Sequence, residues 1–190
     1  MFTHDLRQGV ELFKTVLEEV PEICYAGHPV LREVAAPVTV EEGNVIAARL
    51  ETVLLKYRKI TGLGRGLAAP QIGENKAVFI TYVDDKVEVC MNPKIVERSP
   101  DTNFYRELCI SAGILAADVE RPTWIVLEWA DAEGKQRREK FEGFKARLYQ
   151  HEEAHLRGHL NLDDAVPGGI QFVTFDPREE KLRETSKRLA

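Results

Sequence analysis

Two histidines four residues apart, with a glutamate between them, constrain this chain more than any other feature. The segment is Gln150-His151-Glu152-Glu153-Ala154-His155. On a helix, residues four apart lie about 40° apart around the axis, so the two imidazoles face the same way and can bind one metal ion. Glu152 is adjacent to a candidate ligand and is placed to accept a proton from water rather than to bind the metal. The segment therefore predicts a helix that carries half of a metal site.

The two histidines leave that site incomplete, because a catalytic metal usually has three protein ligands. In the metzincin pattern HExxHxxGxxH the glycine would be Gly158, but the third ligand position is Asn161. A thermolysin-like site takes a glutamate from a later helix, and Glu179 and Glu180 are available in a charged segment that we expect to be solvated. Neither protease pattern completes the ligand set.

A cysteine is the better candidate for the third ligand. The chain has three cysteines, an odd number, and their spacing does not match a disulfide framework, so reduced thiols are expected. Cys90 alternates with valines in a predicted strand and is expected to fill core space. Cys24 lies in a proline-bounded connection without chemical neighbours. Cys109 lies between a polar loop and a short apolar stretch, where a ligand can project. Spacing alone favours Cys109 over the other two cysteines but does not establish it as the ligand.

Composition and charge favour a globular protein over other classes. Hydrophobic residues make up 44% and charged residues 30% of the 190 residues, which argues against global disorder. The net charge is -5, and the short Lys135–Lys140 stretch is the one basic block, so we expect no dedicated nucleic-acid binding. We expect no membrane span, because no apolar run approaches roughly 18 residues. The N-terminus does not resemble a signal peptide, so the expected compartment is the cytoplasm.

The pattern along the chain predicts an α+β fold, with antiparallel β-strands around a central HExxH helix. We expect one domain over residues 1–190, with an N-terminal helical extension over 1–21 and a C-terminal helix over 176–190. The first helix is expected to begin at Asp5. The other expected elements are helices over 41–59 and 144–157, strands over 77–83 and 86–91 joined at Asp84-Asp85, and strands over 124–129 and 135–142.

Helical periodicity also predicts which faces are buried. The first helix should pack through Leu6, Val10, Phe13, Leu17 and Val20, and the second through Val45, Ile46, Leu50, Val53, Leu54 and Tyr57. The HExxH helix should bury Phe144, Leu148 and Glu152, and expose Glu153.

Three separated segments together resemble the peptide deformylase family. Gly64–Gly73 (GRGLAAPQIG) matches its first motif, GxGLAAPQxG. Glu107–Ser111 (ELCIS) is similar to its second motif, EGCLS, and His151–His155 (HEEAH) matches its third, usually HExDH. The order and spacing of the motifs agree with the family, and the resemblance extends from about Tyr25 to Val173.

The resemblance implies a metal site and a hydrolytic mechanism. One thiolate and two imidazoles would hold the metal, namely Cys109, His151 and His155. Family members typically use iron(II), and zinc, nickel or cobalt are substitutes that such ligands also accept. Glu152 would act as the general base. The side-chain amide of Gln71 and the backbone N–H of Ile110 would stabilise the charge that develops on the formyl oxygen.

The resemblance also implies a substrate and partners. The substrate would be the N-terminal formylmethionine of nascent polypeptides, which implies a role in protein biosynthesis and an association with the ribosome. Gly66 would let the substrate backbone approach its loop. Arg121 is expected to pair with Glu107 and brace the loop that carries Cys109. The sequence carries no feature that fixes an oligomeric state.

Three residues near this site depart from the family pattern. Leu108 replaces a glycine where substrate main chain would pass, and could narrow the cleft or pack inward. Arg65 takes the place of a small or apolar residue at the pocket mouth, and could contact an acidic substrate or point to solvent. Ala154 replaces an aspartate and removes an acceptor that could steady nearby groups. Two alternatives therefore stay open: an enzyme for another formylated amine, and a catalytically weak metal-binding interaction protein.

Overall fold

Two antiparallel sheets and three α-helices make up residues 3–173, the part of the chain that the computed structural model describes. The predicted C-terminal helix over 176–190 lies outside these residues. The helices are α1 (Thr3–Glu19), α2 (Val40–Thr61) and α3 (Gly143–Leu156), with short 3-10 turns η1 (Pro29–Arg32), η2 (Ala69–Ile72) and η3 (Ile110–Ala112). The strands are β1 (Gly66–Ala68), β2 (Val78–Val83), β3 (Lys86–Arg98), β4 (Thr102–Leu108), β5 (Leu115–Pro122), β6 (Trp124–Ala130), β7 (Gln136–Glu142) and β8 (Ala165–Phe172).

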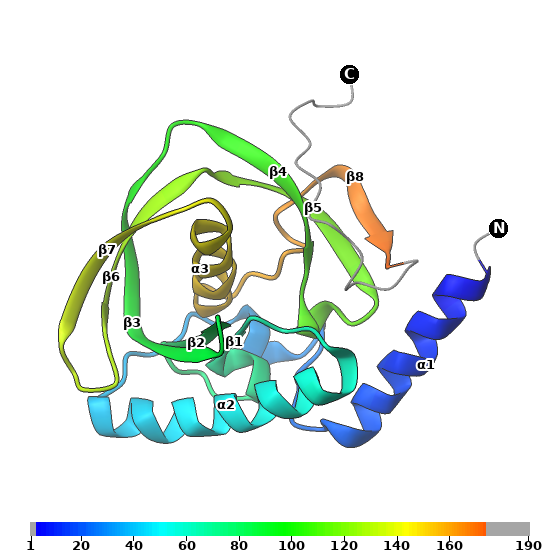
Figure 1. The fold of residues 1–190 in the computed structure, drawn as a ribbon, viewed down its shortest axis with the longest axis horizontal. Coiled ribbons are helices and arrows are strands. Elements are labelled where there is room, and N and C mark those ends of the chain that lie inside the picture. The colour runs from blue at the N-terminus through cyan, green and yellow to red at the C-terminus, as the bar shows by residue number, and fades with distance from the viewer. Residues whose placement is uncertain (1–2, 174–190) are drawn as a thin grey trace.

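The strands enclose helix α3. One sheet has the order β1-β2-β3-β6-β7 and the other the order β4-β5-β8, and all their strand pairs are antiparallel. In Figure 1 α3 is seen end-on at the centre, the strands curve around it, and α2 runs along the lower edge. The predicted α+β arrangement around the HExxH helix is confirmed.

The hairpins follow their turn residues. Asp84 and Asp85 join β2 to β3 with φ of 52° and 57°, and a two-residue hairpin turn of this type requires positive φ at both positions. The β6–β7 hairpin turns over residues 131–134 as predicted. Strand β3 continues to Arg98, well past its predicted end. Strands β4, β5 and β8 were not predicted, because buried charged residues in β4 and β5 interrupt the apolar alternation that marks a strand.

Two of the predicted helix faces are partly wrong. Helix α1 begins at Thr3, and Val16 and Val20 are buried, whereas Val10 and Leu17 are 42% and 44% exposed. Its packed face is therefore rotated from the predicted stripe. In α2 the predicted apolar positions are mostly buried, but Val45 is 65% exposed because it points away from the face that Ile46, Leu50 and Leu54 pack into the core.

Helix α3 is buried almost all round. Leu148 and Glu152 are buried as predicted, but Glu153 is also buried and forms an ion pair with Arg157. Phe144, in the first turn, is 40% exposed, so the prediction that it is buried was wrong. The prediction for Glu153 was wrong because strands surround α3 and leave its middle turns no solvent face.

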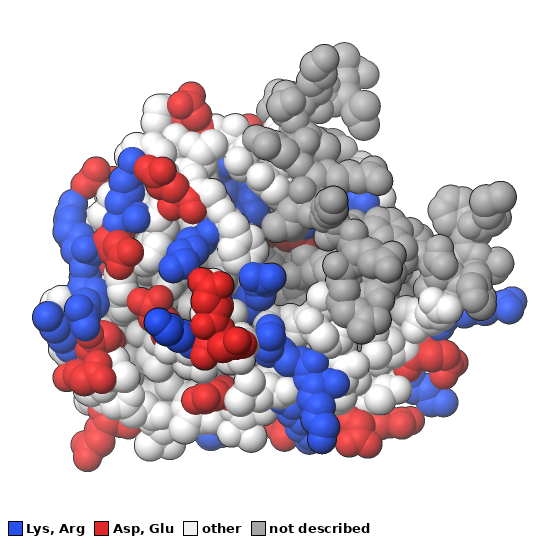
Figure 2. All heavy atoms as spheres, in the orientation of Figure 1, with Lys and Arg blue, Asp and Glu red and all other residues white. Residues whose placement is uncertain are grey.

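The surface shows no block of one charge over β7. Arg138 pairs with Glu97 and Glu128, and Arg137 pairs with Asp131, so acidic partners neutralise the basic stretch. Figure 2 shows basic and acidic side chains interspersed on the visible face. Within residues 3–173, no helix combines the length and the apolar character that crossing a bilayer requires.

Candidate metal centre

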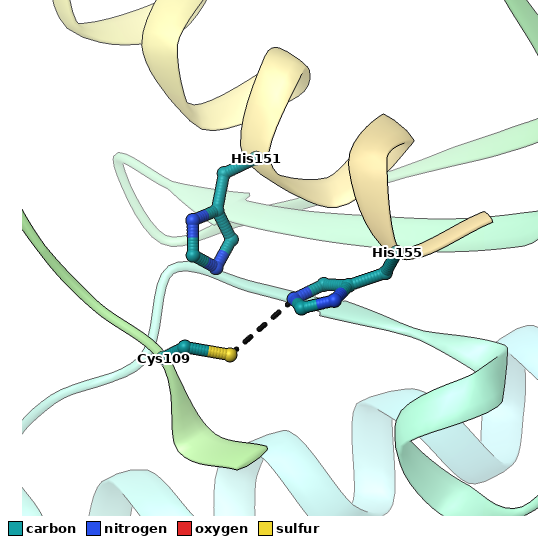
Figure 3. Close-up of side chains that lie close together, drawn as sticks. All are labelled: Cys109, His151 and His155. Carbon is teal, nitrogen blue, oxygen red and sulfur yellow. Dashed lines mark hydrogen bonds between the residues drawn. The ribbon is translucent and has the colours of Figure 1, made fainter. Parts of the chain in front are cut away.

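The predicted ligands converge in the folded chain. Cys109 follows the last residue of β4, and His151 and His155 lie on α3. One ligand atom from each residue lies within 4.8 Å of the other two, and the Cys109 Sγ lies 3.4 Å from the His155 Nε2. Figure 3 shows the thiol and both imidazoles directed at one shared space. Two histidines of one helix and a cysteine more than forty positions before them in sequence therefore form one donor set.

This donor set fits a single divalent metal. Bond lengths of about 2.3 Å to sulfur and 2.0–2.1 Å to nitrogen place tetrahedral ligand atoms roughly 3.3–3.6 Å apart. The 3.4 Å sulfur–nitrogen distance already meets this requirement. Mixed thiolate and imidazole ligands suit several transition metals, so the chemistry of the donors agrees with a metal but does not select one.

A buried glutamate holds one of the histidines. The Nδ1 of His151 donates to the Glu107 Oε2 at 2.9 Å, which leaves Nε2 as the nitrogen for a metal. Arg121 donates to both oxygens of Glu107, at 2.7 and 2.8 Å, so the predicted brace is confirmed. Asn161 donates to the Glu107 backbone carbonyl at 3.0 Å and braces the same loop.

The surroundings of Glu107 and of the two histidines shift their pKa values in different directions. Burial alone would raise the pKa of Glu107, but the Arg121 guanidinium holds it well below its usual range. Burial would lower the pKa of His151, but hydrogen bonds with Cys109 and Glu107 raise it well above its usual value. Burial lowers the pKa of His155 well below its usual value, and the charge of His151 acts in the same direction. The Glu107 carboxylate is therefore charged and can orient His151 at neutral pH.

Arg147 is a second brace that the sequence reasoning missed. Its guanidinium donates to the Glu107 Oε1 at 2.7 Å and to the Val119 carbonyl at 3.1 Å. It also donates to the Asn103 carbonyl at 2.8 Å, and its centre lies 4.6 Å from the Tyr105 ring centroid. These contacts join α3 to β4 and β5. The available signal was its position four residues before His151, on the same helical face.

Glu152 lies buried next to the donor set. The residue is 3% exposed, and its Oε2 has no hydrogen-bond partner among the described residues. Burial raises the pKa of Glu152 to about 7. A carboxyl group with such a pKa can both accept and release a proton near neutral pH.

Gly66 makes room for this carboxylate. A Cβ at position 66 would lie 2.2 Å from the Glu152 Oε1, which is closer than any stable contact. The glycine therefore lets β1 approach the Glu152 side chain. The predicted role of Gly66 in substrate approach remains a prediction, whereas its contact with Glu152 was not foreseen.

We expect Gly66→Ala to lower kcat by roughly 10²-fold, because the new methyl group displaces the Glu152 carboxylate and misplacement by about 1 Å commonly has an effect of this size. Steady-state hydrolysis of a formylated peptide measures the change. In a Glu152→Gln background the same substitution should have little further effect. Equal losses in both backgrounds would show that Gly66 acts by another route.

The predicted oxyanion donors lie beside the thiol. Gln71 is buried, and its Oε1 accepts a hydrogen bond from the Ala68 N–H at 2.8 Å. This contact directs its Nε2 to the Ser111 Oγ at 3.2 Å and to the Cys109 Sγ at 3.5 Å. Ile110 begins η3 immediately after Cys109. The side-chain amide and the Ile110 backbone thus lie next to the donor set.

The three departures from the family pattern also lie near this site. Leu108 is half-buried, and Arg65 is exposed with its guanidinium centre 5.0 Å from the Phe144 ring centroid. Ala154 is buried, and the His155 Nδ1 has no hydrogen-bond partner among residues 3–173.

A single cleft of about 1090 Å³ contains these groups. It is lined by every predicted site residue except His155, namely Arg65, Gly66, Gln71, Leu108, Cys109, Ile110, His151 and Glu152. Two of the three metal-ligand candidates, Cys109 and His151, are therefore open to one ligand together with the buried carboxylate and the amide donors.

Comparisons with known proteins agree with this geometry. The family model for polypeptide deformylase matches residues 20–169. A peptide deformylase of Thermotoga sp. (strain RQ2) is 34% identical over 141 residues, which are 74% of this chain and 84% of the relative. A peptide deformylase of Rhizobium meliloti (strain 1021) is 38% identical over 140 residues, 71% of this chain and 79% of the relative.

A solved structure extends the agreement to the fold. The crystal structure of peptide deformylase from Thermotoga maritima matches with a TM-score of 0.68 and 34% identity, and covers 76% of this chain and 97% of that one. Family model, relatives and fold agree over most of the chain, and the chain belongs to the polypeptide deformylase family.

Proposed function

We propose that this chain is a metal-dependent hydrolase that removes the formyl group from the N-terminal formylmethionine of nascent polypeptides. One observation carries the proposal: in a wide cleft, a thiol and two imidazoles converge beside the buried Glu152 carboxylate, whose Oε2 has no hydrogen-bond partner among the described residues. Family membership gives that arrangement its reaction class. Because polypeptides that start with formylmethionine are synthesised on ribosomes, we propose a role in protein biosynthesis. The activity would take place in the cytoplasm, close to the ribosome.

Each group has a proposed task. Cys109, His151 and His155 would hold one divalent metal, which supplies the Lewis acidity that activates water and polarises the formyl group. Glu152 accepts a proton from the attacking water and passes it to the nitrogen of the leaving amine, and its pKa of about 7 suits both steps. The products are formate and a free N-terminal amine.

The negative charge that develops on the formyl oxygen needs donors. We assign this task to the Gln71 Nε2 and the Ile110 backbone N–H, which lie beside Cys109. Loss of one such donor typically reduces the rate by 10²–10³-fold. We further propose iron(II) as the native metal, with zinc, nickel or cobalt as substitutes, because thiolate and imidazole ligands accept all four.

The substrate could also be another formylated amine, and the cleft supplies the observation that favours this second candidate. Leu108 and Arg65 both line the cleft, where the family pattern has smaller or apolar residues. Leu108 would narrow the path of the substrate main chain. Arg65 would attract a carboxylate close to the reacting centre.

The test is hydrolysis by purified protein loaded with iron(II) under exclusion of oxygen. We expect formate release from formyl-Met-Ala-Ser and no cleavage of unmodified Met-Ala-Ser. Replacement of iron by cobalt should give an absorption band from thiolate coordination, which Cys109→Ser removes. Turnover of another formylated amine but not of formylmethionyl peptides would favour the second candidate. Tight metal binding without any turnover would contradict both and favour a metal-binding interaction protein.

A further inference from the structure

We propose that α1 forms a wall of the substrate cleft, where Leu12 contacts the side chain of a residue that follows the formylated one. This inference rests on the proposed function and adds a specificity determinant to it. The family-model match begins at residue 20, directly after α1, so this wall is an addition to the part of the chain that the family model describes.

Apolar residues of α1 face the same cleft as the reacting groups. Leu12, Phe13 and Val16 of α1 line the same cleft as Cys109 and Glu152. The helix and the reacting groups are therefore two regions of one binding space.

The position of α1 against this cleft is fixed by packing. Val16 and Val20 are buried, and the Phe13 ring lies edge-on to Tyr25 at a centroid distance of 5.2 Å. Phe13 also lies so close to Gly113 that a Cβ at position 113 would be 2.9 Å from the ring. The Gly113 N–H donates to the Ile110 carbonyl at 3.1 Å, so α1 is packed against the turn that follows Cys109.

The chemistry of the substrate decides which part of it reaches α1. The formyl group is the end of the peptide, so cleft space away from the donor set can be filled only by the first side chain or by later residues. Clefts of roughly 300–1,000 Å³ enclose ligands of several residues in size, and this cleft of about 1090 Å³ exceeds what one residue fills. Later residues of the peptide are therefore the occupants that extend toward α1.

The lining near α1 selects for an apolar side chain. Ile60 and Ile114 line the cleft together with the three apolar residues of α1. Charged side chains that line the cleft elsewhere include Arg65, directly before β1, and Asp84 and Asp85, in the turn between β2 and β3. An apolar side chain would lose water-exposed area against these residues, whereas a charged one would lose its hydration. Gln8 of α1 also lines the cleft, but it carries no charge.

The same helix offers a matched control. Leu17 is 44% exposed and is not among the residues that line the cleft. Leu12→Asp and Leu17→Asp therefore introduce the same charge on the same helix, one inside the cleft and one outside it.

The experiment measures hydrolysis of formyl-Met-Ala-Ala and of peptides with leucine or lysine at the second or third position. Wild type and Leu17→Asp should prefer leucine to lysine at one of these positions. Leu12→Asp should raise KM for that leucine peptide by roughly ten-fold and invert the preference toward lysine. Leu17→Asp should keep the wild-type kcat on formyl-Met-Ala-Ala. A uniform loss for all peptides, or the same leucine-to-lysine ratio in all three proteins, would overturn the proposal.

Two further measurements keep this test independent of folding and of the proposed function. Leu12→Gln removes the apolar contact without a charge, and should abolish the leucine preference if Leu12→Asp does not fold. Binding of the deformylated tripeptides by calorimetry requires no turnover. If no variant hydrolyses any formylated peptide but product binding follows the predicted order, the proposed function is wrong and the role of α1 stands. Equal affinities of wild type and the Leu12 variants for these products would refute the role of α1.

Discussion

Glu152→Gln should reduce kcat for formyl-peptide hydrolysis by roughly 10³-fold and leave the metal content of the protein unchanged. Glutamine keeps the size of the side chain but cannot take a proton from water or return one to the leaving amine. Metal content should persist because the donor set consists of Cys109, His151 and His155. Steady-state kinetics and metal analysis of the same preparation measure both parts.

Glu153→Gln is the matched control for this prediction. Glu153 is the next residue of α3 and is also buried, but it faces Arg157, whose Nε lies 3.0 Å from its Oε2. We expect wild-type kcat from this variant. A Glu152→Gln protein that keeps more than a tenth of wild-type kcat would mean that another group moves the proton.

Arg121→Met should lower the free energy of unfolding by about 3 kcal/mol, the lower end of the range for a broken buried ion pair. The change leaves the Glu107 carboxylate buried with two of its four charged hydrogen bonds lost. The remaining partners, Arg147 and His151, limit the loss. Urea unfolding of chelator-treated protein gives the free energy without a contribution from metal binding.

The double variant Arg121→Met, Glu107→Gln tests the physical cause. Because most of the loss comes from an uncompensated buried charge, neutralising Glu107 should restore part of the stability. The cost of the double variant should therefore be smaller than the sum of the two single costs. Additive costs would show that the two side chains stabilise the fold independently.

The parts of the fold that the sequence could predict are those specified locally. The Asp84-Asp85 turn and the β6–β7 hairpin depend on neighbouring residues, and α2 and α3 depend on apolar periodicity. In the structure, Gly62 and Gly158 follow these helices with φ values of 72° and 79°. Each of these elements was found at or near its predicted position.

The parts that could not be predicted depend on burial of polar groups. Strands β4 and β5 carry Glu107 and Arg121, which look like surface residues in a sequence and form a buried pair in the fold. Arg147 on α3 also looks like a surface residue in the sequence and is buried in the fold. The local sequence pattern carries no information about a partner many residues away. The pairing of Arg121 with Glu107 was expected from the family resemblance, but the rest of this buried network is visible only in the structure.

The candidate site also contains residues that the sequence could predict and residues that it could not. Helical geometry alone predicts that His151 and His155 face the same way, with Glu152 next to them. Cys109 was preferred over Cys24 and Cys90 by its surroundings, and the resemblance to a family supported the choice. The cleft wall formed by α1 had no sequence signal, since the predicted stripe of that helix was rotated from the face that packs.

The ligands come from separate structural units, because Cys109 directly follows a strand of the three-stranded sheet and both imidazoles belong to the enclosed helix. An ion bound between them would be a cross-link that exists only in the native state. Ligand linkage then gives native-state stabilisation of about 2.7 kcal/mol when free ion exceeds its dissociation constant a hundred-fold. Metal supply would thus set the lifetime of this protein in the cell as well as its catalytic rate.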